Sequence, residues 1–182
     1  QPANAVVYTT NSRELPGPPS QPMISASQIS SKQVTFKWKP GPDGYAPLRY
    51  YTVQVSSQGG PWSSLGQRID PSFSTYTVTD LKPFTIYQFR IRATNDIGHS
   101  SWSPESPITR TLPAPPDHPV TGVSILPYSP TAISVKWIPI KEWNGDEHGA
   151  GYRIQYCLLS QPLSSNYCPS TMVQGPTVTG IS

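Results

Sequence analysis

The chain has 182 residues, which is enough for one or two domains. Charged residues make up only 13% of it, and its 23 prolines and 13 glycines stay below the fraction typical of disordered chains. No apolar run is long enough for a membrane-spanning helix, and the formal net charge of +3 comes from scattered residues. We therefore expect a folded, turn-rich chain with no membrane segment in this stretch and no nucleic-acid partner.

Short motifs recur in the same order about one hundred residues further along the chain, which indicates two copies of one structural unit. The paired segments are 15–19 and 112–116, 34–40 and 133–139, 51–55 and 152–156, and 78–81 and 178–181.

Apolar and polar residues alternate within these motifs. Val34, Phe36 and Trp38 alternate with polar residues, and the same period of two recurs at 89–94, 135–137 and 152–156. A period of two indicates strands with one buried and one solvated face. Turn-forming clusters separate the strands, so we predict an all-β chain made of β-sandwiches.

The segment Leu81–Tyr87 resembles the Leu-x-Pro-x-Thr-x-Tyr motif of fibronectin type III domains. The resemblance implies tandem type III sandwiches, one complete and one truncated. It also implies that the hydroxyl of Tyr87 is bonded to nearby backbone, as in a tyrosine corner. The core landmarks it assigns are Trp38, Tyr51, Leu81, Tyr87, Trp137 and Tyr152.

The same resemblance predicts the domain boundaries. Residues 1–15 are expected to be the tail of a preceding type III domain plus a linker, and 16–111 a complete domain. Residues 112–119 are predicted to be a Pro-rich linker, which should behave as a semi-rigid spacer. Residues 120–182 are expected to form a partial domain that lacks strands F and G of the type III fold.

Further motifs are similar to the type III repeats of the sidekick family of cell-adhesion receptors. They are Asp43–Val55, Thr94–Gly98 and Trp143–Gly145. This resemblance implies an extracellular segment of a single-pass receptor at cell junctions or synapses. Its expected partners are proteins, including a second copy of the same receptor, and neighbouring immunoglobulin-like and type III domains. A repeat of a receptor tyrosine phosphatase ectodomain is an alternative.

Catalytic motifs are absent from the sequence. It contains no GxSxG, HExxH, P-loop or GxGxxG pattern. His99, His118 and His148 are expected in loops, without neighbours that would complete a set of metal ligands. We therefore predict no enzyme activity, no metal site and no cofactor.

Of the two cysteines, Cys157 is predicted to end one strand and Cys168 to begin the next, with a turn between them. In a hairpin they would face each other closely enough to form a disulfide, which is compatible with an extracellular location. Two free buried thiols are the alternative.

The segment Gly98–Ser103 resembles the Trp-Ser-x-Trp-Ser box of cytokine receptors, with His99 in place of the first tryptophan. Arg90 and Arg92 should point outward from the preceding strand and stack on Trp102 in a cation–π ladder. Two interpretations follow: a ladder that stabilises the domain, or a ligand-binding module of cytokine-receptor type.

Three loop aromatics, Trp62, Trp143 and Tyr45, are candidates for an interaction surface, because such residues are enriched at interface hot spots. Packing of a ring over its own domain is the alternative, and it is favoured for Trp143.

Overall fold

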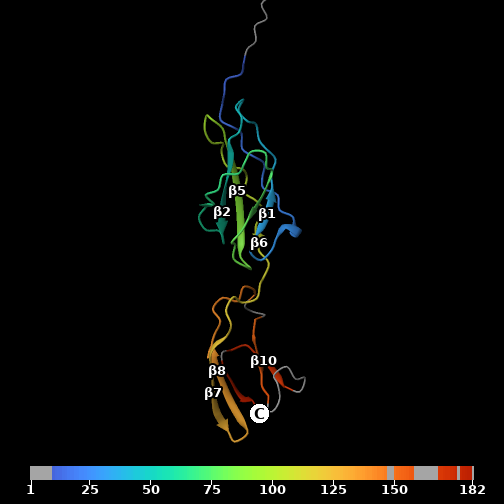
Figure 1. The fold of residues 1–182 in the computed structure, drawn as a ribbon, viewed down its shortest axis with the longest axis vertical. Helices are drawn as coiled ribbons and strands as arrows, with labels where there is room; N and C mark the ends of the chain where they lie inside the picture. The colour runs from blue at the N-terminus through green and yellow to red at the C-terminus, as the bar shows by residue number, and fades with distance from the viewer. Residues whose placement is uncertain (1–9, 147–149, 158–167, 176, 182) are drawn as a thin grey trace, which may run out of the picture. The chain divides into compact units, whose positions relative to one another are not determined.

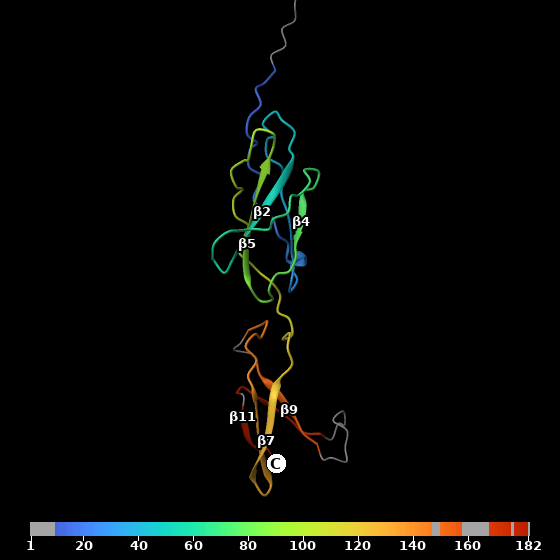
Figure 2. The same cartoon turned by 60° about the vertical axis from the view of Figure 1, so that its left-hand side comes forward.

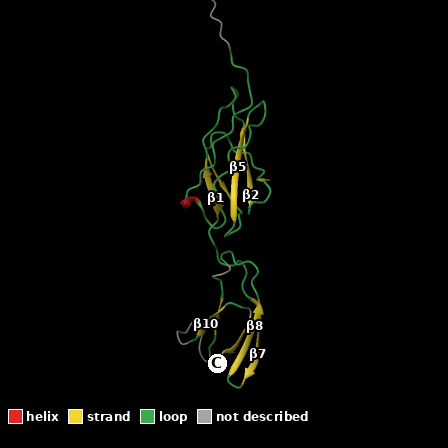
Figure 3. Ribbon diagram, turned by 180° about the vertical axis from the view of Figure 1, so that it is seen from behind, coloured by secondary structure: helices red, strands yellow, loops and turns green. Residues whose placement is uncertain are grey.

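The computed structural model describes residues 10–146, 150–157, 168–175 and 177–181. The chain divides into two compact units, Gln1–Leu112 and Pro113–Ser182, called unit 1 and unit 2 below. Strands dominate both units, and the one helix among the described residues is the single 3-10 turn Ala26–Gln28, drawn red in Figure 3. The all-β fold predicted from the alternation of residues is confirmed.

Unit 1 contains two antiparallel sheets. β1 (Val34–Lys37) pairs with β4 (Thr75–Val78). The second sheet has the order β3 (Ser63–Ser64), β2 (Tyr50–Ser57), β5 (Ile86–Thr94) and β6 (Thr109–Arg110). Figures 1 and 2 show β2 and β5 side by side along their length.

The core of unit 1 forms between these sheets from the alternating apolar positions. Phe36 from β1 packs on Phe89 from β5, with ring centroids 5.5 Å apart. Trp38, immediately after β1, meets Tyr51 of β2 edge-on at 5.3 Å. All four side chains are buried, as a period of two with one face inward requires.

A hydrogen-bonded corner closes the sandwich before β5. The hydroxyl of Tyr87 accepts a hydrogen bond from the backbone N–H of Lys82 at 2.9 Å. The hydroxyl of Thr111 donates to the carbonyl oxygen of Lys82 at 2.6 Å and accepts from the N–H of Thr85. These bonds satisfy backbone groups that are partly or fully buried where the chain turns into the sheet.

Unit 2 contains a three-stranded sheet of β11 (Thr177–Ile181), β8 (Ala132–Ile138) and β7 (Thr121–Ser129). A second pair joins β9 (Tyr152–Gln155) to β10 (Ser170–Val173). By the offset of about one hundred residues, β8, β9 and β11 correspond to β1, β2 and β4 of unit 1.

The strand β7 has no counterpart among the strands predicted from the sequence. Its alternation of apolar and polar residues is interrupted at Leu126 and Pro127, and all nine of its residues are exposed. The sequence pattern of β7 does not indicate a buried face, so its strand conformation is recognised from its pairing with β8.

The core of unit 2 is small. Its buried apolar side chains, among the described residues, are Val135, Trp137 and Tyr152, with Cys168 at the margin. Trp137 and Tyr152 meet edge-on with centroids 4.9 Å apart, as Trp38 and Tyr51 do in unit 1. The repeat seen in the sequence is therefore also a repeat of core packing.

Candidate functional site

The segment after β5 runs along that strand and pairs with it through serine residues. The three serines donate their backbone N–H groups to carbonyl oxygens of β5 at 2.8–2.9 Å, and their hydroxyls accept the N–H groups of the same β5 residues at 2.9–3.1 Å. The pairs are Ser100 with Ala93, Ser103 with Ile91, and Ser106 with Phe89. A spacing of three places the serines on one side of an extended chain with three residues per turn.

This arrangement holds Trp102 over the outer face of the sheet, because Trp102 lies between two of the serines. The guanidinium carbon of Arg92 is 4.6 Å from the centre of the Trp102 ring, and that of Arg90 is 4.8 Å from it. The structure thus brings together the three residues assigned to the ladder. Their side chains are half-buried.

Trp62 is a further member of the ladder. The guanidinium carbon of Arg90 is 4.4 Å from its ring centre, so Arg90 lies over both tryptophans. The sequence placed Trp62 among the loop aromatics, whereas the structure makes it a half-buried partner of Arg90 just before β3. The contact joins residues that lie far apart in the sequence, so no local sequence pattern predicts it.

Side chains of β2 support the two arginines from the neighbouring strand. Arg90 donates from Nε and Nη2 to the side-chain oxygen of Gln54, at 2.9 and 2.6 Å. Arg92 donates from Nε to the hydroxyl of Thr52 at 3.3 Å. The register explains these bonds, because Gln54 lies opposite Arg90 and Thr52 opposite Arg92.

Two more arginines of unit 1 lie over aromatic rings. Arg68 is 4.4 Å from the ring centre of Tyr50 at one end of β2, and Arg110 of β6 is 4.7 Å from that of Phe84. Each contact has the geometry of a cation–π interaction. Both arginines were missed from the sequence, because only tertiary contact pairs them with rings.

A hydrogen-bonded strap joins the Pro-rich lead-in of unit 1 to the loop before β2. Glu14 donates its N–H to the carbonyl oxygen of Gly44 at 2.8 Å. The buried side chain of Asn95 donates to the carbonyl oxygens of Glu14 and Asp43. Gly44 has a φ of 71°, and a Cβ there would collide with the Glu14 carbonyl, so the close approach requires glycine.

An exposed ion pair lies beside this strap. Arg49 donates from Nε and Nη2 to the two carboxylate oxygens of Asp96, at 2.6 and 3.0 Å. The hydrogen bond from Arg49 holds the pKa of Asp96 below its usual value, and the charge of Arg13 adds to this effect.

An equivalent strap exists in unit 2, where Ala114 and Asn144 lie one hundred positions after Glu14 and Gly44. Ala114 donates its N–H to the carbonyl oxygen of Asn144 at 2.9 Å. The Asn144 side chain donates to the carbonyl oxygen of Pro115 at 3.1 Å and to the Asp117 carboxylate at 3.0 Å. Asn144 adopts a φ of 56°, which asparagine tolerates better than most residues.

Few residues separate the last hydrogen-bonded residue of unit 1 from the strap of unit 2. Leu112 donates its N–H to the carbonyl oxygen of Ser30 and accepts the N–H of Phe84, so it belongs to unit 1. The predicted linker of 112–119 is therefore anchored at Leu112 to unit 1, and at Ala114 to the Asn144 loop of unit 2.

The other two loop aromatics have different environments. Trp143 is half-buried and packs edge-on against Tyr152, with ring centroids 5.2 Å apart. Tyr45 is 60% exposed with a φ of 55°, and its N–H donates to the carboxylate of Asp43. Trp62 and Tyr45 lie in unit 1 and Trp143 in unit 2.

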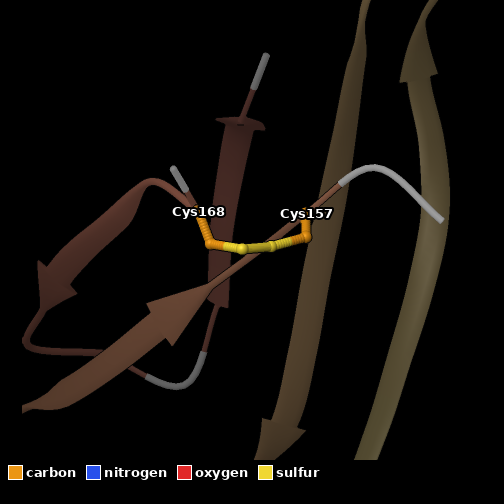
Figure 4. Close-up of a disulfide and its surroundings, with 2 residues drawn as sticks. All are labelled: Cys157 and Cys168. Atoms are coloured by element: carbon orange, nitrogen blue, oxygen red, sulfur yellow. A yellow bond between two sulfur atoms is a disulfide. The ribbon is translucent and has the colours of Figure 1, made fainter. Parts of the chain in front are cut away.

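Cys157 and Cys168 form a disulfide in unit 2, shown in Figure 4. Their Cα atoms are 5.0 Å apart, which is within the range of disulfides. They lie just outside the paired strands, because β9 ends at Gln155 and β10 begins at Ser170, whereas the sequence predicted them as the terminal residues of those strands. The intervening residues 158–167 lie outside the described residues.

An apolar groove of about 450 Å³ opens in unit 2 between β7, β8 and β9. Its walls include Val123 and Ile125 of β7, which are 59% and 62% exposed, and Trp137 of β8. In unit 1, β5 pairs with β2 and covers the matching core. Among the described residues of unit 2, β9 pairs with β10 alone.

The three histidines have separate environments. His99 Nδ1 lies 2.8 Å from the hydroxyl of Thr94, His118 is exposed, and His148 lies outside the described residues. Within the described ranges, no group of three or more His, Cys, Asp or Glu side chains is arranged to hold a metal ion. No helix in that part of the chain is long and apolar enough to cross a membrane.

Two antiparallel sheets around one core and a tyrosine corner define unit 1 as a β-sandwich module of the immunoglobulin-like type. The family model described as "Fibronectin type III domain" matches residues 17–109, and the chain belongs to this family. The resemblance to the sidekick family is also confirmed. The chain is 50% identical to "Protein sidekick" of Drosophila melanogaster over 95% of its own length and 8% of that protein's length.

Other relatives agree with this assignment. The chain is 40% identical to "Protein sidekick-2" of Mus musculus over 85% of its length, and 32% identical to "Cell adhesion molecule DSCAM" of Gallus gallus over 76%. It spans less than a tenth of the length of each of these proteins. Among solved structures, the "chicken CNTN1 FN1-FN3 domains" match with a TM-score of 0.61 and 26% identity, covering 92% of this chain and 56% of that one.

Proposed function

We propose that this segment is a stiff spacer in the extracellular part of a single-pass adhesion receptor at cell junctions or synapses, without catalytic activity. The name of one relative, "Cell adhesion molecule DSCAM", supports the adhesive context. Protein partners would include neighbouring domains of the same receptor and a second copy of it. Residues 120–182 would form a partial type III domain, a proposal supported by the apolar groove where unit 1 carries β5.

One observation carries the spacer proposal. Leu112 is hydrogen-bonded within unit 1 and Ala114 within unit 2, and Pro113 is the one residue between them. Proline has a fixed φ, and it also restricts the residue before it to extended conformations. A junction of this length and composition has few soft torsions, so bending there should be small.

Measurement of ¹⁵N relaxation on the two units tests this proposal. A stiff junction predicts that both units share one rotational correlation time. Insertion of four Gly/Ser residues after Pro113 should shorten the correlation time of each unit. The same insertion between Gln58 and Gly59, in an exposed turn of unit 1, is the control and should leave the coupling intact. Independent tumbling of the unmodified chain would refute the proposal.

A ligand-binding module of cytokine-receptor type was the other interpretation of Trp102. The stacking of Arg90 and Arg92 on Trp102 is compatible with such a module. The same stacking is equally expected if the ladder only stabilises the domain. A soluble helical ligand whose binding is lost in Trp102→Ala, with unit 1 still folded, would favour the receptor module over the spacer.

A further inference from the structure

Four arginines, Arg68, Arg90, Arg92 and Arg110, form what we call the arginine track of unit 1. All lie on the outer face of the sheet β3-β2-β5-β6. Arg90 and Arg92 are outward positions of β5, and Arg110 lies opposite the outward Ile86. Arg68 lies over Tyr50, which pairs with Thr94 at the far end of β5. The track therefore spans about eight strand positions, or roughly 26 Å.

These guanidinium groups lack acidic partners. Among the described residues, no arginine of the track has a carboxylate within ion-pair distance, whereas Arg13 and Arg49 both pair with Asp96. The outward residues of β2 beside the track are uncharged. Ten of the 13 Lys and Arg residues lie in residues 1–112, against six of the 10 Asp and Glu residues.

Hydrogen-bond donors are left over in the middle of the track. A guanidinium carries five N–H donors. Arg90 directs two of its donors at the same Gln54 oxygen, and Arg92 directs one at Thr52. The aromatic rings occupy the flat faces of the guanidinium groups and provide no acceptor for the remaining N–H groups.

The rings also hold the charges in place. Arg90 lies over two tryptophans, and each of the other three arginines lies over one ring. A side chain that is already ordered loses less conformational entropy when it binds an anion. The planar fork of N–H donors also matches pairs of oxygens on sulfate or carboxylate groups.

We propose that the arginine track binds a linear sulfated polysaccharide of the heparan sulfate type. A row of cations over roughly 26 Å matches an extended polyanion with a repeated charge, whereas a single phosphate would use one position. The choice of a glycan depends on the extracellular location given under the proposed function. The binding itself does not depend on the stiffness of the domain junction.

Titration of the full chain with a heparin octasaccharide, followed by calorimetry at low and physiological salt, tests this proposal. The double variant Arg68→Gln/Arg110→Gln changes the exposed ends of the track and leaves the Trp62–Trp102 ladder in place. Its matched control is Lys37→Gln/Lys39→Gln, which removes the same charge on and beside β1, in the other sheet. Thermal unfolding of each variant verifies the fold.

We expect the track variant to weaken heparin binding about tenfold, on the scale of two exposed ion pairs, and the control to change it less than twofold. De-sulfated heparin should bind weakly. Equal losses in both variants would show binding to net charge alone and would overturn the proposal. Absence of heparin binding at low salt would overturn it too, as would preference for a polyglutamate peptide of equal charge, which would indicate an acidic protein partner.

Discussion

The contact between Trp102 and Arg92 should contribute measurably to the stability of unit 1. The guanidinium carbon of Arg92 is 4.6 Å from the ring centre, and both side chains are half-buried. Cation–π contacts at such sites are worth about 0.5–1 kcal/mol. Burial of half of an indole adds about 2.5 kcal/mol, from ~100 Å² at ~25 cal/mol per Å². With the Arg90 contact also lost, Trp102→Ala should cost about 4 kcal/mol.

A double-mutant cycle separates the ring–cation contact from simple burial. The variants are Trp102→Leu, Arg92→Met and their combination, with the free energy of opening read from amide hydrogen exchange of β5. We expect a coupling energy of about 0.5–1 kcal/mol. The same cycle between Trp102 and Lys37 of the other sheet should give a coupling near zero. Equal values in the two cycles would refute the assignment of the ladder as a stabilising stack.

Three further predictions concern single interactions. Tyr87→Phe removes the acceptor of the partly buried backbone N–H of Lys82 and should lower the free energy of unfolding of unit 1 by about 1 kcal/mol in denaturant titration. Reduction, or Cys157→Ser/Cys168→Ser, should destabilise unit 2 by about 3 kcal/mol on the chain-entropy model and leave amide exchange in unit 1 unchanged. Because the folded-state pKa of Asp96 is lowered, its contribution is present above the unfolded pKa of about 3.9 and is lost as pH falls through the folded value. Arg49→Gln should raise the pKa of Asp96 toward its ordinary value in an NMR titration.

Most of the strands predicted from the sequence were found from the alternation of apolar and polar residues. The alternation around Phe36 and Phe89 reveals strands and their buried face, because side chains of a strand point alternately to its two sides. The family resemblance gave Trp38, Tyr51, Trp137 and Tyr152 as core landmarks, and the structure shows that each Trp packs edge-on against the Tyr of its own unit.

Strand β7 could not be predicted from local sequence patterns. Its exposed residues carry no clear period, so its pairing with β8 defines it. The stacking of Trp62 on Arg90 likewise depends on tertiary structure, because β2 pairs both with β3, which follows Trp62, and with β5, which carries Arg90.

The sequence alone therefore determined the fold class, the family, the repeat and the orientation of the outward arginines of β5, because these depend on short-range pattern. Tertiary structure alone decided which rings those arginines contact and that Arg68 and Arg110 extend the same track. It also decided that Leu112 and Ala114 are anchored to different units. Such contacts join residues whose separation in the chain carries no periodic signal, and they exist only after the sheets have assembled.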